Sequence, residues 1–168
     1  LIRWEQVPSN DRLRLKEEAL IRDRLQYCFG KHLLKVGHLS AEIDTSSCLI
    51  NHQINLLNFE EPSKKCGLHA EYDELPILSD SVDAILMSHI IEYGSDPHQI
   101  LREAHRTLVP NGNLIITIFN PISLLSLQRF MPFNKYTDFN QGRFFSIPRI
   151  KDWLHLLGFE VVSEQFVY

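Results

Sequence analysis

Residues 69–119 read HAEYDELPILSDSVDAILMSHIIEYGSDPHQILREAHRTLVPNGNLIITIF, and this stretch decides the fold. Residues 82–88 form a nearly continuous apolar run, which is typical of a buried parallel strand. Asp96 can then cap a helix that Pro97 begins, and Pro-Asn-Gly at 110–112 has the composition of a turn. Residues 113–119 form a second apolar run. The pattern predicts two parallel strands joined by a helical crossover.

The rest of the chain continues this alternation. The sequence predicts an amphipathic helix over 10–29, strands over 32–37 and 48–57, a helix over 122–130, and a Ser-capped helix ended by Gly158 and followed by a strand to residue 166. Alternating strands and helices call for an α/β fold with a parallel sheet and helices on both faces. With 168 residues and 44% hydrophobic content, the chain suits one globular domain. We expect residues 1–31 to form an N-terminal helical cover and 32–168 the main domain.

Composition and charge exclude several classes of partner. The net charge is −4 and the sequence has no basic stripe, so we expect no nucleic-acid partner. No apolar run approaches the roughly 20 residues of a membrane span. The opening stretch LIRWEQVPSND lacks the apolar segment of a signal peptide, which favours a cytoplasmic location. Neither the three cysteines nor the eight histidines show paired metal-ligand spacing, so we expect no metal site.

The central run also carries a family resemblance. It contains an acidic residue, Leu-Pro, a loop, an Asp within the strand over 82–88, a His at the end of that strand, an Asp-Pro helix start and an Asn-Gly turn. In this order the features resemble the type-11 domain of class I S-adenosylmethionine-dependent methyltransferases, which occurs in ubiquinone and menaquinone biosynthesis enzymes. The resemblance covers about residues 32–166. It implies a Rossmann-like methyltransferase sheet, shortened around the second and third strands because the mostly polar residues 58–67 replace a helix and much of a strand.

The resemblance implies S-adenosylmethionine as the cofactor, bound at the carboxyl ends of the strands. The residues at the matching positions are Gly37, His38, Asn55, Glu71, Tyr72, Ser88 and His89. Gly37 is the one glycine kept from a three-glycine loop, and it is equally well explained as a strand-to-helix turn. His38 either contacts the cofactor or faces solvent. Asn55 (or Gln53) would take the place of the acid that holds the ribose hydroxyls.

The remaining positions concern the adenine and the acceptor. Glu71 stands where the family places the acid that contacts the adenine amino group, and Tyr72 could pack on the ring. Ser88 and His89 end the strand over 82–88. His89 is a candidate general base because a histidine titrates near neutral pH, and the alternative is a hydrogen-bonded wall residue. Methyl transfer asks little of side chains, since the sulfonium is already activated, so the sequence assigns no catalytic residue.

Three departures from the family pattern leave the activity open. Lys35 stands where the first strand should end in an acid, Leu39 replaces a glycine, and the second strand ends without an acid. A lysine beside a cationic cofactor at ~4 Å costs roughly 1 to 4 kcal/mol. The chain is therefore either a methyltransferase acting on a small-molecule or lipid-like acceptor or a catalytically inactive methyltransferase-fold protein that serves as a binding or regulatory module. The family sheet has a seventh strand, which a second copy in a homo-oligomer could supply.

Overall fold

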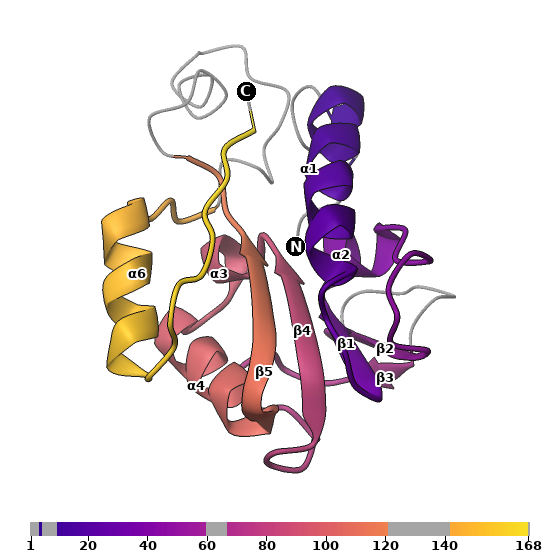
Figure 1. The fold of residues 1–168 in the computed structure, drawn as a ribbon. Coiled ribbons are helices and arrows are strands. Elements are labelled where there is room, and N and C mark those ends of the chain that lie inside the picture. The colour runs from indigo at the N-terminus through magenta and orange to yellow at the C-terminus, as the bar shows by residue number, and fades with distance from the viewer. Residues whose placement is uncertain (1–3, 5–9, 60–66, 121–141, 168) are drawn as a thin grey trace.

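A five-stranded parallel sheet forms the centre of the computed structural model, which describes residues 4, 10–59, 67–120 and 142–167 (Figure 1). The strands are β1 (His32–Val36), β2 (His52–Leu57), β3 (Leu68–His69), β4 (Val82–Ser88) and β5 (Leu108–Thr117). The helices are α1 (Asn10–Leu25), α2 (His38–Glu42), α3 (Ile90–Tyr93), α4 (Pro97–Thr107) and α6 (Ile147–Leu156). The strand order is β3-β2-β1-β4-β5, and all neighbours are parallel. The predicted α/β, Rossmann-like fold is confirmed.

Helices cover both faces of the sheet because successive strand residues point to opposite sides. Leu34 and Ile85 belong to the core cluster that contains buried residues of α4 and α6. Leu33 and Leu86, each one position away, belong to the second cluster, which contains Ile21 and Leu25 of α1 and Leu39 of α2. The apolar runs of β1 and β4 are continuous because both of their faces are buried.

The β3 edge of the sheet is short, as the sequence predicts. β3 has two residues, and they pair with Leu56 and Leu57 of β2. β2 itself begins at His52, later than the predicted start at residue 48. The outer part of the sheet on this side therefore offers few backbone hydrogen bonds, and the loop that follows β3 needs other anchors.

Helix α4 begins as predicted and ends earlier. The Asp96 side chain accepts hydrogen bonds from the backbone N–H groups of His98 and Gln99, and Pro97 occupies the first turn. The Gln99 side chain accepts a hydrogen bond from Arg102. The helix ends at Thr107, and β5 begins directly. The predicted turn at 110–112 is an irregularity inside β5, where the register with β4 jumps between Val82 and Ala84.

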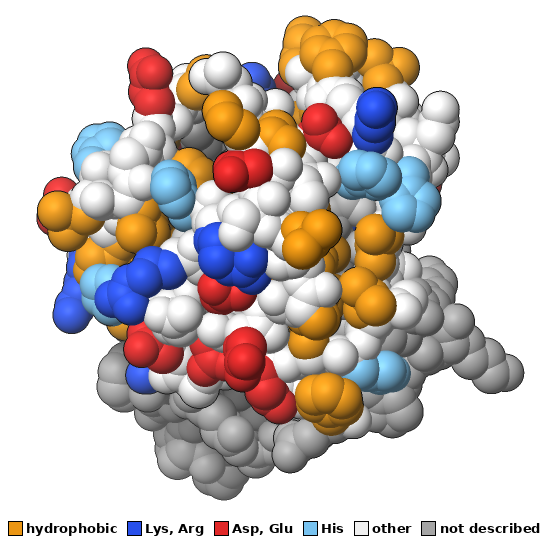
Figure 2. Space-filling view, turned by 90° about the horizontal axis from the view of Figure 1, so that it is seen from below, with side chains coloured by type: hydrophobic (Ala, Val, Ile, Leu, Met, Phe, Trp, Pro, Cys, Tyr) orange, Lys and Arg blue, Asp and Glu red, His pale blue; other side chains and the backbone are white. Residues whose placement is uncertain are grey.

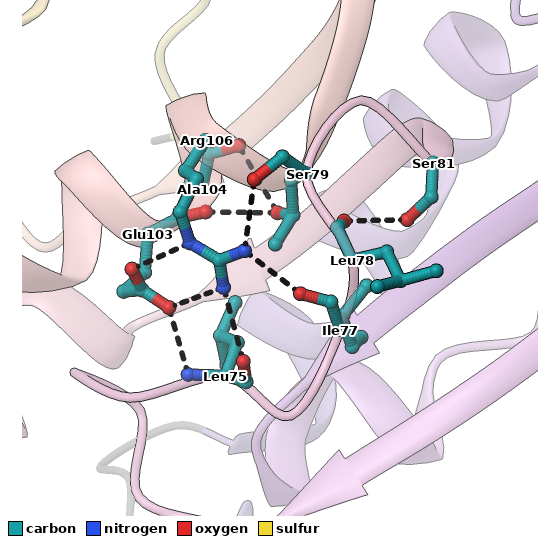
Figure 3. A network of polar contacts seen from close by, with 9 residues as sticks. Leu75, Ile77, Leu78, Ser79, Ser81, Glu103, Ala104 and Arg106 are labelled. Carbon is teal, nitrogen blue, oxygen red and sulfur yellow. Dashed lines mark hydrogen bonds and ion pairs between the residues drawn. The ribbon is translucent and has the colours of Figure 1, made fainter.

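A network of polar contacts anchors the loop between β3 and β4 to α4 (Figure 3). The Arg106 guanidinium donates to both oxygens of Glu103 and to the carbonyls of Leu75 and Ile77, and it lies 3.3 Å from Ser79 Oγ. Glu103 also accepts from the backbone N–H of Leu75. We call these five residues the loop network. It sits close to the start of β4, and Figure 2 shows this end of the molecule, where acidic and basic side chains are interspersed.

The C-terminal segment departs from the prediction. Ser146 precedes α6 in an extended conformation, but its side chain makes no capping hydrogen bond. Residues 159–167 form no strand, which contradicts the strand predicted there, and Val162 is 90% exposed. Strand propensity reports only that side chains suit a pleated surface, and a strand also needs a paired neighbour. The helix predicted over 122–130 lies outside the described residues.

Helix α1 is shorter than predicted, since it ends at Leu25. Its residues Ile21 and Leu25 share a core cluster with Leu33 of β1, so the helix is packed onto the sheet. Within the described ranges, no helix combines the length and the apolar character that crossing a membrane requires.

Candidate functional site

The candidate site is the edge of the sheet at which the parallel strands end. In open α/β sheets, ligands bind outside the carboxyl ends of the strands. Of the residues predicted from sequence, Gly37 follows β1, Glu71 and Tyr72 follow β3, and Ser88 and His89 end and follow β4. All five thus lie at this edge. Asn55 does not, because it lies inside β2, where it pairs in register with Lys35.

The turn after β1 requires a glycine for two reasons. Gly37 has φ 86°, which side chains rarely adopt, and a Cβ atom built there would lie 2.1 Å from Cδ1 of Ile90. The Gly37 N–H donates to the carbonyl of Leu56, which ties the turn to β2. His38, the next residue, is half-buried, and its Nδ1 lies 3.1 Å from a carboxylate oxygen of Glu42. The turn interpretation of Gly37 is thereby supported by its packing, and its contact with a cofactor stays a prediction.

The Lys35 ammonium group is bound by acceptors at the end of α2. It donates to the carbonyl of Ile43 at 2.8 Å, to Thr45 Oγ1 at 3.3 Å and to the carbonyl of Ala41 at 3.5 Å. These acceptors lie at and beyond the end of α2, where helix carbonyls lack internal partners and a cation is favourable. Lys35 is 5% exposed, so burial and these acceptors hold the ammonium at the end of α2.

The polar residue that leaves β2 is Asn58. Its side-chain amide donates to Glu71 Oε2 at 2.7 Å, and its backbone N–H lies 3.2 Å from the Tyr72 hydroxyl. Tyr72 is buried and belongs to the core cluster of β1 and β4, whereas Glu71 is exposed. The strand was predicted to end at residue 57, as it does in the structure, but Asn55 inside it was chosen for the ribose contact. The signal that could have found Asn58 is its position directly after the last apolar residue of the run, Leu57.

The end of β4 carries a buried histidine in an unusual backbone conformation. His89 is 2% exposed and has φ 57°, in the left-handed region. Its ring stacks on Phe119 with centroids 3.7 Å apart and meets the Trp4 ring edge-on. Before it, Ser88 donates its backbone N–H to Ser40 Oγ, which links β4 to α2.

Two buried carboxylates that the sequence analysis missed flank His89. Glu17 of α1 places Oε2 3.0 Å from His89 Nε2 and accepts a hydrogen bond from Thr117 Oγ1 at 2.6 Å. Glu92 of α3 places Oε1 3.4 Å from His89 Nδ1 and accepts from the backbone N–H of Phe119 at 2.6 Å. We call Glu17, His89, Glu92 and Thr117 the strand-end network. A signal existed for Glu17, which lies at helical spacing between the apolar residues of its face.

The strand-end network keeps His89 protonated. Burial alone lowers the pKa of His89, but Glu17 and Glu92 outweigh this effect and raise it from 6.5 to about 10. The imidazole is therefore a cation at neutral pH, and both ring nitrogens carry protons that face carboxylates. His89 consequently does not fit the role of general base, and the alternative of a hydrogen-bonded wall residue agrees with the structure.

In the described part of the chain, no group of three or more His, Cys, Asp or Glu is placed to hold a metal ion. Cys28 and Cys48 are buried free thiols. Burial, together with the neighbouring Cys48, raises the pKa of Cys28 from 9.0 to about 11, so this thiol stays protonated and unreactive.

Comparisons with known proteins agree with this architecture. A family model described as a methyltransferase domain matches residues 24–164. The uncharacterised Escherichia coli protein YafS is 37% identical over 159 residues, which cover 95% of this chain and 65% of that protein. A demethylmenaquinone methyltransferase of Chlamydia pneumoniae is 27% identical over 101 residues, covering 58% of this chain and 44% of the relative. The chain thus spans less than two thirds of the length of either relative.

Among solved structures, an S-adenosylmethionine-dependent methyltransferase of Thermotoga maritima, described as a possible histamine N-methyltransferase, superposes with a TM-score of 0.71. The match covers 89% of this chain and 72% of that chain at 21% identity, so the likeness concerns the fold.

Proposed function

The chain belongs to the class I S-adenosylmethionine-dependent methyltransferases, and on this premise we propose that it transfers the methyl group of S-adenosylmethionine to a small-molecule or lipid-like acceptor. The observation that carries the proposal is the grouping of Gly37, Asn58, Glu71 and Tyr72 where β1, β2 and β3 end. The turn at Gly37 leaves the backbone uncovered by a side chain, and the polar side chains beside it are able to bind a nucleoside.

The Asn58–Glu71 pair suits the adenosine part of the cofactor. A carboxylate accepts two hydrogen bonds and an amide both donates and accepts, which matches the neighbouring hydroxyls of a ribose and the amino group of an adenine. Glu71 is exposed and Asn58 is half-buried, so their polar atoms can exchange partners without a large desolvation cost. We propose Asn58 in place of Asn55 for the ribose, with Gly37, His38 and Tyr72 along the adjoining wall and Ser88 and His89 toward the acceptor.

The residues of this chain act mainly by position. When bound, the cofactor supplies a methyl group on an activated sulfonium, so an acceptor held in line needs little further activation. The cationic ring of His89 braces the wall at the end of β4 through Glu17, Glu92 and Phe119. A lipid-like acceptor is supported by the name of the chlamydial relative, a demethylmenaquinone methyltransferase.

A second candidate function rests on the turn after β1. Leu39 is buried in the core, where the family pattern has a glycine, and the neighbouring β1 position holds Lys35 in place of an acid. Loss of both features suits a methyltransferase-fold protein that binds a ligand or a partner without catalysis. Such a protein would have no need to bind S-adenosylmethionine, which separates the two candidates.

Calorimetric titration with S-adenosylmethionine and S-adenosylhomocysteine tests the proposal. We expect micromolar binding by the wild-type protein and a loss of about tenfold or more in Glu71→Ala and Asn58→Ala. Glu74→Ala is the matched control, because Glu74 is an exposed acid on the same loop. Absence of binding at millimolar ligand would reject the methyltransferase and favour the non-catalytic module. Equal affinity in wild type and Glu71→Ala would move the cofactor away from this pair.

A further inference from the structure

Glu92 has a carboxylate oxygen that the fold does not use. Its side chain is buried, with the residue 1% exposed, and Oε1 accepts from Phe119 while facing His89. Oε2 has no hydrogen-bond partner within the described ranges. Buried carboxylate oxygens are costly to leave unpaired, so an unpaired one at a strand end points to a ligand.

The Ser88 hydroxyl is a second buried polar group without a partner among the described residues, and it lies at the same corner of the molecule, the carboxyl end of β4. The backbone N–H of Ser88, in contrast, is bound by Ser40. Ser88 ends β4 and Glu92 lies one turn further on, in α3. Because Ser40 belongs to α2, the bond to Ser88 also places this corner against the turn at Gly37.

The charge of this corner selects a cation. Glu17 and Glu92 flank a single imidazolium, so the three side chains carry one formal negative charge in excess. The Lys35 ammonium is held at the end of α2 by carbonyl groups. The Phe119 ring is stacked on His89 and the Trp4 ring meets His89 edge-on, so the surroundings of this strand end are apolar. One free carboxylate oxygen and one hydroxyl are fewer ligands than a metal ion takes, and the described residues offer no group of three or more His, Cys, Asp or Glu for one, so a weakly hydrated organic cation fits better.

We propose that Glu92 and Ser88 form a subsite for a compact organic cation, an ammonium or sulfonium group, at the carboxyl end of β4. The inference rests on the proposed function and names what this corner of the site would bind. Two sources share the chemistry: the methionine end of S-adenosylmethionine, and an amine acceptor beside it. Glu17 differs from Glu92 because both of its carboxylate oxygens are already bound, one facing His89 and the other bound by Thr117.

The test measures, by calorimetry, the affinity of the wild type and of the variants Glu92→Gln, Ser88→Ala and Glu17→Gln for three nucleosides. S-adenosylmethionine and S-adenosylhomocysteine carry the ammonium group, whereas methylthioadenosine has no cation. If the methionine end occupies the subsite, Glu92→Gln should lower the affinity for the first two nucleosides by about 10- to 100-fold, which is the range for a charged hydrogen bond. The affinity for methylthioadenosine should stay within about twofold of the wild-type value. Glu17→Gln should change all three ligands to the same extent. Ser88→Ala, which removes only a hydroxyl, supplies the measurement if Glu92→Gln does not fold.

Trimethylammonium distinguishes the two sources. Added to protein saturated with S-adenosylhomocysteine, it should be blocked if the methionine end fills the subsite. If the subsite serves an amine acceptor, trimethylammonium should still shift the backbone amide NMR signals of Ser88 and Glu92 in the wild type, but not in Glu92→Gln. The inference is wrong if Glu92→Gln affects all three nucleosides alike and trimethylammonium shifts no signal with or without S-adenosylhomocysteine. If the wild type binds none of the nucleosides, the proposed function fails, and trimethylammonium on the free protein tests the subsite by itself.

Discussion

The loop network and the strand-end network are both built on carboxylates. They differ in how far apart their members lie in the sequence and in whether every carboxylate oxygen has a hydrogen-bond partner. Glu103 and Arg106 are three residues apart on α4, and both oxygens of Glu103 are bound. Arg106 holds the pKa of Glu103 below its usual value, while burial opposes this shift. Glu17 and His89 are 72 residues apart, and Glu92 keeps an oxygen unpartnered within the described ranges. A network that only secures a loop completes its own hydrogen bonds, whereas the incomplete network lies where ligands bind.

The largest expected effect is that of breaking the strand-end network at its cation. His89→Leu keeps the volume but leaves Glu17 and Glu92 facing each other in the interior. Removing one partner of a buried ion pair costs about 3 to 5 kcal/mol, and we expect the free energy of unfolding in urea to fall by that amount. His155→Leu, an exposed histidine on α6, is the control and should stay within about 0.5 kcal/mol. Equal stability of the two variants would contradict the cationic state of His89.

The dependence of stability on pH should differ between the networks. Since the pKa of His89 is raised from 6.5 to about 10 in the folded protein, its contribution is complete below pH 6.5 and is lost as the pH rises toward 10. The free energy of unfolding should therefore fall between pH 7 and pH 9 by up to about 1.4 kcal/mol per pH unit. His89→Leu should flatten this slope, whereas the loop network has no group that titrates in this window. An unchanged slope in His89→Leu would assign the dependence to other groups.

A smaller effect is expected from breaking the loop network. Arg106→Met leaves Glu103 and the carbonyls of Leu75 and Ile77 without their donor, and we expect a loss of about 1 to 3 kcal/mol. Hydrogen exchange should accelerate in the loop between β3 and β4 and stay slow in β4. Arg102→Met is the control, because Arg102 is exposed on the same helix and donates to Gln99. Faster exchange throughout the sheet would show that the network supports more than the loop.

The smallest effects compare one hydroxyl from each network. Thr117 donates to buried Glu17 at 2.6 Å, and Thr117→Val should cost about 1 to 2 kcal/mol. Ser79 is exposed and lies 3.3 Å from Arg106, so Ser79→Ala should change the free energy of unfolding by less than about 0.5 kcal/mol. Thermal unfolding of the two variants beside the wild type measures the difference. A larger loss for Ser79→Ala would reverse the ranking of the networks.

Local chemistry made much of the fold predictable. The apolar run of β4 matches the predicted residues 82–88, and the Asp96 cap begins α4 as expected. Both features can be recognised from a few consecutive residues, because a strand buried on two faces is a continuous apolar run and an N-cap hydrogen bond joins residues two or three positions apart. The strand predicted after Gly158 is wrong for the complementary reason. The window suits a strand, but residues 159–167 are paired with none of the described strands.

The candidate site was predictable only in outline. The resemblance placed Gly37, Glu71, Tyr72 and the Ser88–His89 pair at the edge where the strands end, but Asn55 was chosen where Asn58 leaves β2. The strand end itself was predicted correctly at residue 57, so the choice between the two amides depended only on how the family pattern was matched to the strand. The sequence could not decide between the two roles offered for His89, because a histidine in a sequence carries no information about the carboxylates that will surround it.

The sequence by itself determined the central strands, the start of α4 and the parallel character of the sheet, because apolar periodicity and caps act over a few residues. The family followed from the resemblance carried by residues 69–119. The tertiary structure alone decided that Lys35 binds the carbonyls at the end of α2 and that Glu17 crosses from α1 to His89. It also decided that an oxygen of Glu92 and the hydroxyl of Ser88 are buried without partners in the described part of the chain. These properties arise from groups far apart in the sequence that meet in a low-dielectric interior, where charge and hydrogen bonding depend on the neighbours that folding supplies.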